Sequence, residues 1–359
     1  MTAALFTTVV LMMAISILTL EWAGYDAKLA LRALWKGSLG SSYALASATL
    51  VRATPLIFTG LAVALAFRAG VFNIGAEGQL LAGAAVAAVV ASTLSTVLGP
   101  LTLPAELIGG VVAGACWAGI AAWLRSRFRV LEIISTIMLN FVALHVVGYL
   151  VRGPLQEPLR IYPQSSILPD VGTMPRLIPG TRLHWGLTIA IAVAVILWWL
   201  LRRTAAGFRL RASGANPIAA RSAGLINVSR VTAFAFIGSG ALAGLAGAVE
   251  LTGVTFALYE NISPGYGYTA IAVALLARLD PLRVIAAGFF FGALEAGASA
   301  MQRDAGVPAA FVSVVEAMIV LVVIAFDAIR GTWPIRREAS AQLTLPRSIA
   351  QATRSVSLS

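Results

Sequence analysis

Long apolar runs dominate this chain and limit what it can fold into. Windows of roughly 18 residues with almost no charge recur along it, a length typical of a helix that spans a membrane. They include Gln79 to Val97, Leu107 to Leu124, Ile133 to Val151, Trp185 to Leu201, Val231 to Val249 and Phe311 to Phe326. Only 11% of the residues are charged, against about 25% in soluble domains. Since backbone groups cannot stay unpaired in hydrocarbon and the alternation of a β-barrel is absent, we predict an all-α polytopic membrane protein.

The charges between the runs predict a topology. The hydropathy pattern gives about ten transmembrane spans, at 2–20, 50–67, 78–98, 105–124, 133–151, 185–201, 231–250, 266–277, 284–300 and 309–327. In this arrangement 17 of the 26 lysines and arginines lie on one side. The positive-inside rule makes that side cytoplasmic, so both termini are predicted to lie inside. The net charge of +11 then reflects topology, and no nucleic-acid partner is expected.

The chain divides into two parts by composition. We interpret residues 1–330 as a transmembrane domain, with 2–20 as a retained first span and not a cleaved signal. Residues 331–359 read as a basic cytoplasmic tail that is partly disordered.

Two of the predicted spans are interrupted by glycine-rich polar segments, FNIGAEGQ at 72–79 and NISPGYGYT at 261–269. These breaks hold matching places in spans 2–5 and 7–10 but on opposite sides of the membrane. That arrangement predicts an inverted repeat, with the transport path at the interrupted helices. The residues expected to line the path, and to hydrogen-bond a hydroxylated or heterocyclic solute, are Asn73, Glu77, Gln79, Asn140, Asn261, Tyr266 and Tyr268. For Glu77 a structural role is equally open, with its carboxylate bound to free amides near Gly75 and Gly78.

Small residues and prolines shape the other segments. Glycines four residues apart predict close helix packing inside the subunit, with a subunit interface as the alternative; the pairs are Gly110 and Gly114, Gly240 and Gly244, and Gly288 and Gly292. The substantial external connections are 21–49 and 152–184, and the second contains six prolines, too many for a long helix. We expect an ordered loop that caps the transporter or contacts a delivery protein, although an inert connector is equally open.

A polar stretch, the coupling loop 202–230, carries six arginines and no acidic residue. Within it, Asn216 and Pro217 supply a helix cap and a favoured first helical residue. Residues 218–223 give one or two turns, and Gly224 ends them. A short rigid helix on the cytoplasmic face could transmit a push from a docked protein. The alternative is an amphipathic surface helix without such a role.

Several kinds of chemistry have no residues to support them. Neither lysine, Lys28 or Lys36, belongs to a phosphate-binding loop, so ATP hydrolysis is not expected in this chain. The two histidines, His145 and His184, lack metal-ligand spacing to each other or to the single cysteine. Ser239 stands in Gly-Ser-Gly and not in a G-x-S-x-G elbow, so we interpret it as a helix-packing residue. We therefore predict a transport subunit and not an enzyme.

An ion-coupled secondary carrier is the main alternative. Such carriers use acidic groups inside the bundle as relays. The acids that could serve, although structural pairing is favoured for each, are Glu77, Glu132, Glu250, Glu295, Glu316 and Asp327.

Taken together, these motifs resemble the permease subunits of ABC importers of the branched-chain amino acid, simple sugar and nucleoside type, closest to the nucleoside-like branch. The resemblance spans about 50–327, and its most specific stretches are FNIGAEGQ and GYGYTAIAVALL. It implies a core of about ten helices in a bacterial inner membrane. The solute it favours is a nucleoside, followed by a simple sugar.

The resemblance also implies partners. These are a cytoplasmic ABC ATPase that holds ATP and Mg, a second permease subunit, and a periplasmic or lipid-anchored solute-binding protein; no cofactor is expected on this chain. The helix that couples to the ATPase maps onto Asn216, Pro217, Ala219, Ala220 and Gly224. The chain departs from the family at Ile218, where a glutamate is common, which argues against a charged contact there.

Overall fold

The computed structural model describes residues 17–222, 226–308, 310, 311, 313–315, 317 and 318. Its helices are α2 (Ala27–Ser38), α3 (Ser42–Ala44), α4 (Leu50–Arg68), α5 (Ala76–Leu98), α6 (Thr102–Phe128), α7 (Glu132–Arg152), α8 (Gly186–Arg203), α9 (Ala205–Ala215), α10 (Pro217–Ser222), α11 (Val228–Glu250), α12 (Tyr266–Leu276) and α13 (Pro281–Ala305). Two π-helical turns (Leu45–Thr49 and Leu251–Thr255) and two 3-10 turns (Gly99–Leu101 and Asp170–Gly172) complete the elements. Among these residues, β-structure is limited to isolated bridges.

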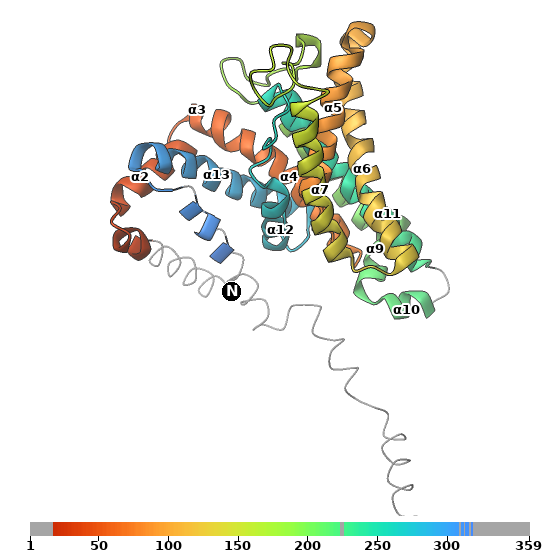
Figure 1. Ribbon diagram of the computed structural model, residues 1–359. Helices are drawn as coiled ribbons and strands as arrows, with labels where there is room; N and C mark the ends of the chain where they lie inside the picture. The colour runs from red at the N-terminus through yellow and green to blue at the C-terminus, as the bar shows by residue number, and fades with distance from the viewer. Residues whose placement is uncertain (1–16, 223–225, 309, 312, 316, 319–359) are drawn as a thin grey trace, which may run out of the picture.

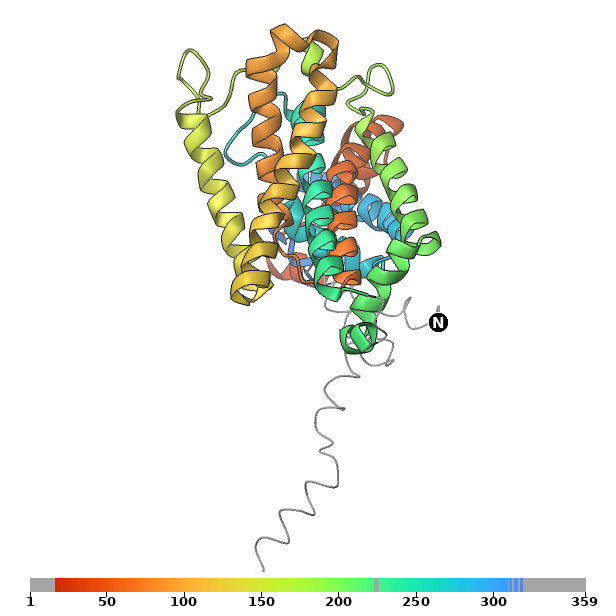
Figure 2. The same cartoon turned by 90° about the vertical axis from the view of Figure 1, so that its right-hand side faces the viewer.

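Six helical stretches are long and apolar enough to cross a membrane: Ser42–Arg68, Ala76–Phe128, Glu132–Arg152, Gly186–Arg203, Val228–Thr255 and Pro281–Ala305. The second stretch contains both α5 and α6, which turn back on each other and lie side by side (Figures 1 and 2). These observations confirm an all-helical polytopic membrane protein. The predicted span 266–277 is the shorter helix α12, and the predicted spans 2–20 and 309–327 lie largely outside the described residues.

Glycines allow the close crossing of α6 and α11. A Cβ on Gly114 of α6 would overlap the carbonyl oxygen of Gly240 on α11, and a Cβ on Gly244 would overlap that of Gly110. On α13, a Cβ at Gly292 would lie 2.7 Å from the backbone nitrogen of Ala53 in α4. The spaced glycines therefore pack helices within the subunit, because only glycine lets the backbones approach this closely.

The segment 21–49 differs from the connection expected there, because much of it is helical. Asp26 caps α2 by accepting a 2.9 Å hydrogen bond from the Leu29 amide. One face of α2, with Ala30 buried, packs on α13 around Met301. A Cβ on Gly37 would overlap the Ala300 side chain, so the two helices touch closely. Small residues on both helices make this packing possible.

The two ends of the bundle carry different structures. The loop between α7 and α8 lies at one end, and α10 lies at the opposite end (Figures 1 and 2). This arrangement places the proline-rich loop and the arginine-rich loop on opposite sides of the bundle, as the topology predicts. Figure 1 also shows α12 set between α13 on one side and α7 on the other.

Candidate functional site

The first break joins α4 to α5 through residues 69–75. Gly70 adopts a φ of +73°, a conformation that favours glycine. Asn73 is fully buried, and its side-chain oxygen accepts a 2.9 Å hydrogen bond from the Gly75 amide. Its side-chain nitrogen donates to Gln79 at 3.0 Å and to the Ser239 hydroxyl at 2.8 Å. Ser239 was expected only to pack between helices. Its hydroxyl instead accepts a hydrogen bond that links the first break to α11.

The second break follows α11. After the π-helical turn Leu251–Thr255 the chain runs irregularly to Gly265, whose φ is +102°. The Ser263 hydroxyl accepts hydrogen bonds from the Gly265 and Tyr266 amides, at 3.1 and 3.0 Å. It thereby caps the first turn of α12.

The two breaks meet at Glu77. Its buried carboxylate accepts a 2.7 Å hydrogen bond from the Gly267 amide at the start of α12. A Cβ on Gly267 would overlap the Glu77 backbone, so glycine is required for this contact. The Gly75 and Gly78 amides, expected as structural partners of Glu77, bond to Asn73 and Asn140 instead. Glu77 thus satisfies a helix N-terminus of the other break, where a negative group is favoured.

Asn140 of α7 completes the junction. Its side-chain oxygen accepts from the Gly78 amide at 2.8 Å, and its nitrogen donates to the Ile74 carbonyl at 3.0 Å. The same nitrogen lies 3.4 Å from the hydroxyl of Tyr268 on α12. One buried amide therefore links α5, α7 and α12.

The structure brings most of the predicted path residues together, and most of them are buried. Asn73, Glu77, Gln79, Asn140 and Tyr266 are buried, whereas Asn261 and Tyr268 are exposed. The buried amides bond to one another, to Ser239 and to backbone groups. In this conformation they hold the two breaks against each other.

The acidic groups weighed as ion relays occupy different surroundings. Glu132 pairs with Arg125 at 3.5 Å near the start of α7, and Glu250 is buried at the end of α11. Glu316 and Asp327 lie outside the described residues. Glu106 is a further acidic residue that the sequence does not single out; it is fully buried on α6 and has no hydrogen-bond partner for either oxygen among the described residues.

The short helix predicted after Asn216 is present as α10. The Asn216 side chain accepts a 2.9 Å hydrogen bond from the Ala219 amide, and Pro217 is the first helical residue, as expected. Ile218 is exposed and Ala220 is buried. Gly224 lies outside the described residues.

Helix α9 connects α10 to the first break. A Cβ on Gly214 of α9 would overlap the carbonyl oxygen of Arg68, the last residue of α4. A Cβ on Gly70 would lie 3.2 Å from the Gly214 Cα. Because these backbones touch directly, a displacement of α9 would reach residues 68–70 without an intervening side chain.

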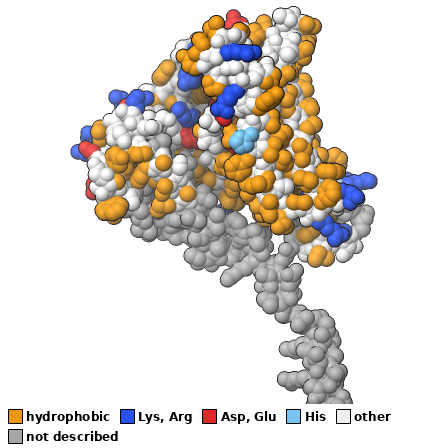
Figure 3. Space-filling view, viewed as in Figure 1, with side chains coloured by type: hydrophobic (Ala, Val, Ile, Leu, Met, Phe, Trp, Pro, Cys, Tyr) orange, Lys and Arg blue, Asp and Glu red, His pale blue; other side chains and the backbone are white. Residues whose placement is uncertain are grey.

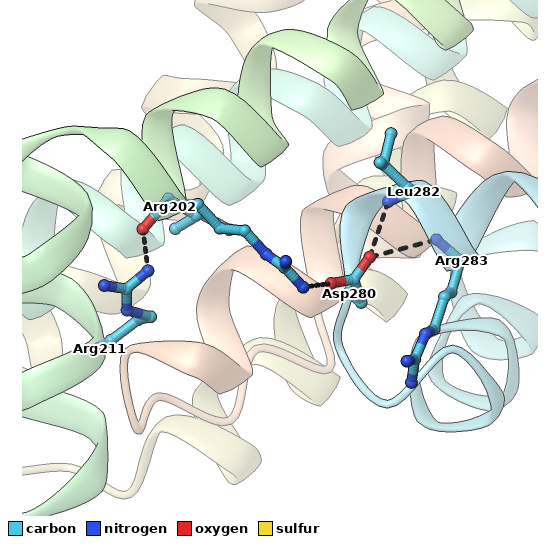
Figure 4. Close-up of polar contacts among 6 residues, drawn as sticks. Arg202, Arg211, Asp280, Leu282 and Arg283 are labelled. Carbon is cyan, nitrogen blue, oxygen red and sulfur yellow. Dashed lines mark hydrogen bonds and ion pairs between the residues drawn. The ribbon is translucent and has the colours of Figure 1, made fainter.

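A charged contact holds the α8–α9 elbow to α13 (Figure 4). Arg202 donates a 2.8 Å hydrogen bond to Asp280, and Arg211 donates to the Leu201 carbonyl. The other oxygen of Asp280 accepts from the Leu282 and Arg283 amides at 3.2 and 3.4 Å and so caps α13. The same carboxylate therefore serves as ion-pair partner and as helix cap.

At the opposite end, the loop between α7 and α8 is ordered and hydrogen-bonded to the second break. The Ser165, Leu168 and Met174 amides donate to the carbonyls of Leu258, Phe256 and Thr252, at 2.9, 2.8 and 2.9 Å. These bonds confirm that the loop is ordered, and whether it contacts a delivery protein or is an inert connector stays a prediction.

His184 closes the base of this loop, and its side chain is buried. Its Nδ1 accepts from the Gly186 amide at 3.2 Å. Burial, together with the nearby charge of Arg182, lowers the pKa of His184 to about 4. The imidazole is therefore neutral near pH 7.

Comparisons with known proteins give a consistent result. The family model described as branched-chain amino acid transport system / permease component matches residues 45–324. A glucose ABC transporter permease protein of Haloferax volcanii is 42% identical over 77% of this chain and 74% of its own length. The guanosine ABC transporter permease protein NupP of Bacillus subtilis is 37% identical over 90% of this chain and 92% of its own length. The nucleoside ABC transporter permease protein NupB of Lactococcus lactis is 32% identical over 83% of each chain.

Proposed function

The chain belongs to the family of branched-chain amino acid transport system permease components and is a permease subunit of an ABC importer, and we propose that the solute it moves inward is a nucleoside. Two relatives named for guanosine or nucleoside transport align over at least 83% of this chain, whereas the relative named for glucose aligns over 77%. A simple sugar is the second candidate, because the glucose permease has the higher identity, 42%.

The observation that carries the mechanism is the direct contact between the two breaks. Glu77 at the start of α5 binds the Gly267 amide at the start of α12. Both helices begin within the bundle, so a small shift between them would open or close a path at their junction. Asn73, Gln79 and Asn140 would exchange their present partners for the solute when that shift occurs.

The movement that causes this shift would be transmitted through α10. We assign α10, with Gly224 beyond it, to contact with a separate cytoplasmic ATPase that binds ATP and Mg. The exposed Ile218 offers an apolar contact to that partner. A push on α10 would pass through α9 to the contact between Gly214 and Arg68, and from there to the first break.

The wider architecture is proposed on the same basis. It comprises ten spans with both termini cytoplasmic, an inverted repeat of spans 2–5 and 7–10, a transmembrane domain over 1–330 and a tail over 331–359. A second permease subunit and a periplasmic or lipid-anchored binding protein would complete the importer in a bacterial inner membrane. No cofactor is assigned to this chain.

The test is reconstitution of the tagged chain with the proteins that co-purify from mild detergent. Nucleoside uptake into proteoliposomes, driven by ATP on the α10 side, is the expected result. Deletion of 217–223 should abolish both uptake and recovery of the ATPase, while membrane insertion persists. Uptake driven by a proton or sodium gradient without ATP would overturn the proposal in favour of a secondary carrier. Uptake of glucose but not guanosine would overturn the assigned solute.

A further inference from the structure

Helix α7 carries one polar side chain on a face that is otherwise apolar and exposed. An open, shallow depression of about 490 Å³ lies along this face, and we call it the groove; its lining residues are Met138, Phe141, Val142, His145, Val146 and Tyr149. Hydrophobic side chains cover much of this side of the molecule (Figure 3), and His145 is exposed among them. All six lining residues belong to α7, so the described part of the chain supplies only one wall of this groove.

The depth of His145 argues against contact with lipid. At 1.5 Å per residue it lies about 20 Å along the helix from Glu132 and about 10 Å from Arg152. This position falls within a hydrocarbon core of about 30 Å, whichever end is cytoplasmic. The imidazole makes no hydrogen bond to any described residue, and an unpaired polar group in hydrocarbon costs several kcal/mol. Ionisable side chains within spans usually face a wet cavity.

The junction of the two breaks contacts the neighbouring face of α7. Tyr268 of α12 is 45% exposed, and its hydroxyl lies 3.4 Å from the side-chain nitrogen of Asn140, on the neighbouring face of α7. At the far end of α7, Arg152 pairs with Glu260 of the second break. Polar groups of α12 and of the second break therefore contact α7 near both ends of this face.

The order of side chains along α7 indicates what the groove would bind. Phe141, His145 and Tyr149 follow one another at intervals of four residues, which places them along one helix face. Phe141 is 51% exposed and Tyr149 is 71% exposed. Aromatic rings stack on planar bases with little dependence on which base is present, while an imidazole can both donate and accept hydrogen bonds.

We propose that His145 hydrogen-bonds the heteroaromatic ring of the transported solute, with Phe141 and Tyr149 packing against that ring on either side. A second permease subunit would supply the opposite wall of the groove. This assignment rests on the proposed function, since it places the base of a nucleoside on α7.

The first test asks whether this face meets water. Replacing Cys116 by serine removes the single cysteine, and His145→Cys then introduces one reporter. In the complex, a membrane-impermeant thiol reagent should modify this cysteine, and saturating guanosine should slow the modification at least five-fold. Ile196→Cys is the matched control, because Ile196 is 60% exposed on α8 among apolar residues, and it should stay unmodified. Lack of modification at position 145 would place this face in lipid and overturn the proposal, as would modification that guanosine does not slow.

The second test measures uptake. His145→Ala should raise the KM for guanosine about ten-fold, and His145→Gln should restore part of the loss because its amide can also donate and accept. Ile196→Ala should transport as the wild type does. If the wild type carries guanosine and His145→Ala matches it, this inference fails while the proposed function stands. If the wild type carries no nucleoside, the proposed solute fails with it, whereas ATP-driven uptake of another solute would still support the importer.

Discussion

The contribution of the hydrogen bond between Glu77 and Gly267 to stability can be measured by comparing substitutions at two buried glutamates. Glu77 is 7% exposed and accepts a 2.7 Å hydrogen bond, while Glu106 is 0% exposed and has no partner among the described residues. Replacing Glu77 by leucine keeps the volume roughly constant but leaves the Gly267 amide buried and unsatisfied. Such a loss costs about 1–3 kcal/mol. Glu77→Gln keeps an acceptor oxygen and forfeits mainly the interaction with the helix N-terminus, about 0.3–1 kcal/mol.

The same substitutions at Glu106 serve as controls. Glu106→Leu removes a buried carboxyl that has no hydrogen bond, so stability should be unchanged or increased. The assay is the apparent melting temperature of each purified variant in one detergent, followed by intrinsic fluorescence at a fixed scan rate. The expected order is Glu77→Leu lowest, Glu77→Gln intermediate, and wild type and Glu106→Leu highest. A Glu77→Leu variant as stable as the wild type would refute the reasoning, as would an equal loss at Glu106.

Three further predictions concern packing, a helix cap and pH. Gly114→Ala should impair folding because its Cβ would overlap the Gly240 carbonyl, whereas Gly119→Ala, with open space beside it, should be neutral or stabilising in the same fluorescence melt. Asp280→Ala should cost about 1 kcal/mol more stability than Arg202→Ala, because the aspartate also caps α13. The melting temperature should therefore fall further in Asp280→Ala, and equal decreases would contradict the capping role. The neutral, buried His184 contributes stability above pH 6.5 that falls as the pH drops toward 4, because the unfolded chain binds the proton more tightly. Wild type should therefore lose more stability than His184→Gln between pH 7 and pH 4.5, and parallel melting curves would count against it.

The start of α10 and the two breaks show what could be predicted from the sequence. Asn216 and Pro217 predict the start of α10 correctly because capping depends only on neighbouring residues. The breaks predicted at 72–79 and 261–269 agree in part with the structure, because 72–75 and 261–265 are not helical whereas 76–79 and 266–269 form the first turns of α5 and α12. The contacts of these breaks were harder to predict. Asn73 and Gln79 bond each other and Ser239 in this structure, and Ser239 lies 166 residues from Asn73 in the sequence.

The glycine pairs left two alternatives open, packing within the subunit or an interface between subunits, and the tertiary structure shows packing within the subunit. A spacing of four residues indicates a close crossing but does not name the partner helix. Gly110 and Gly114 meet Gly240 and Gly244 of the same chain, so these faces are not available to a second subunit. The burial of Glu106, in contrast, is not indicated by the sequence at all. A glutamate at the edge of an apolar run is normally interpreted as a solvated charge. Only the packing around α6 shows that Glu106 is fully buried.

The sequence by itself determined that this is a helical membrane protein, where most of its helices run and where two of them break. It could do so because hydrocarbon fixes the length of a span and obliges the backbone to pair within it, and both effects are local. Only the tertiary structure decided that Glu77 satisfies the start of α12, across 190 residues of sequence, and that His145 stands on an exposed face. Such choices depend on which helices touch, and the side-chain pattern of one helix does not specify its neighbours.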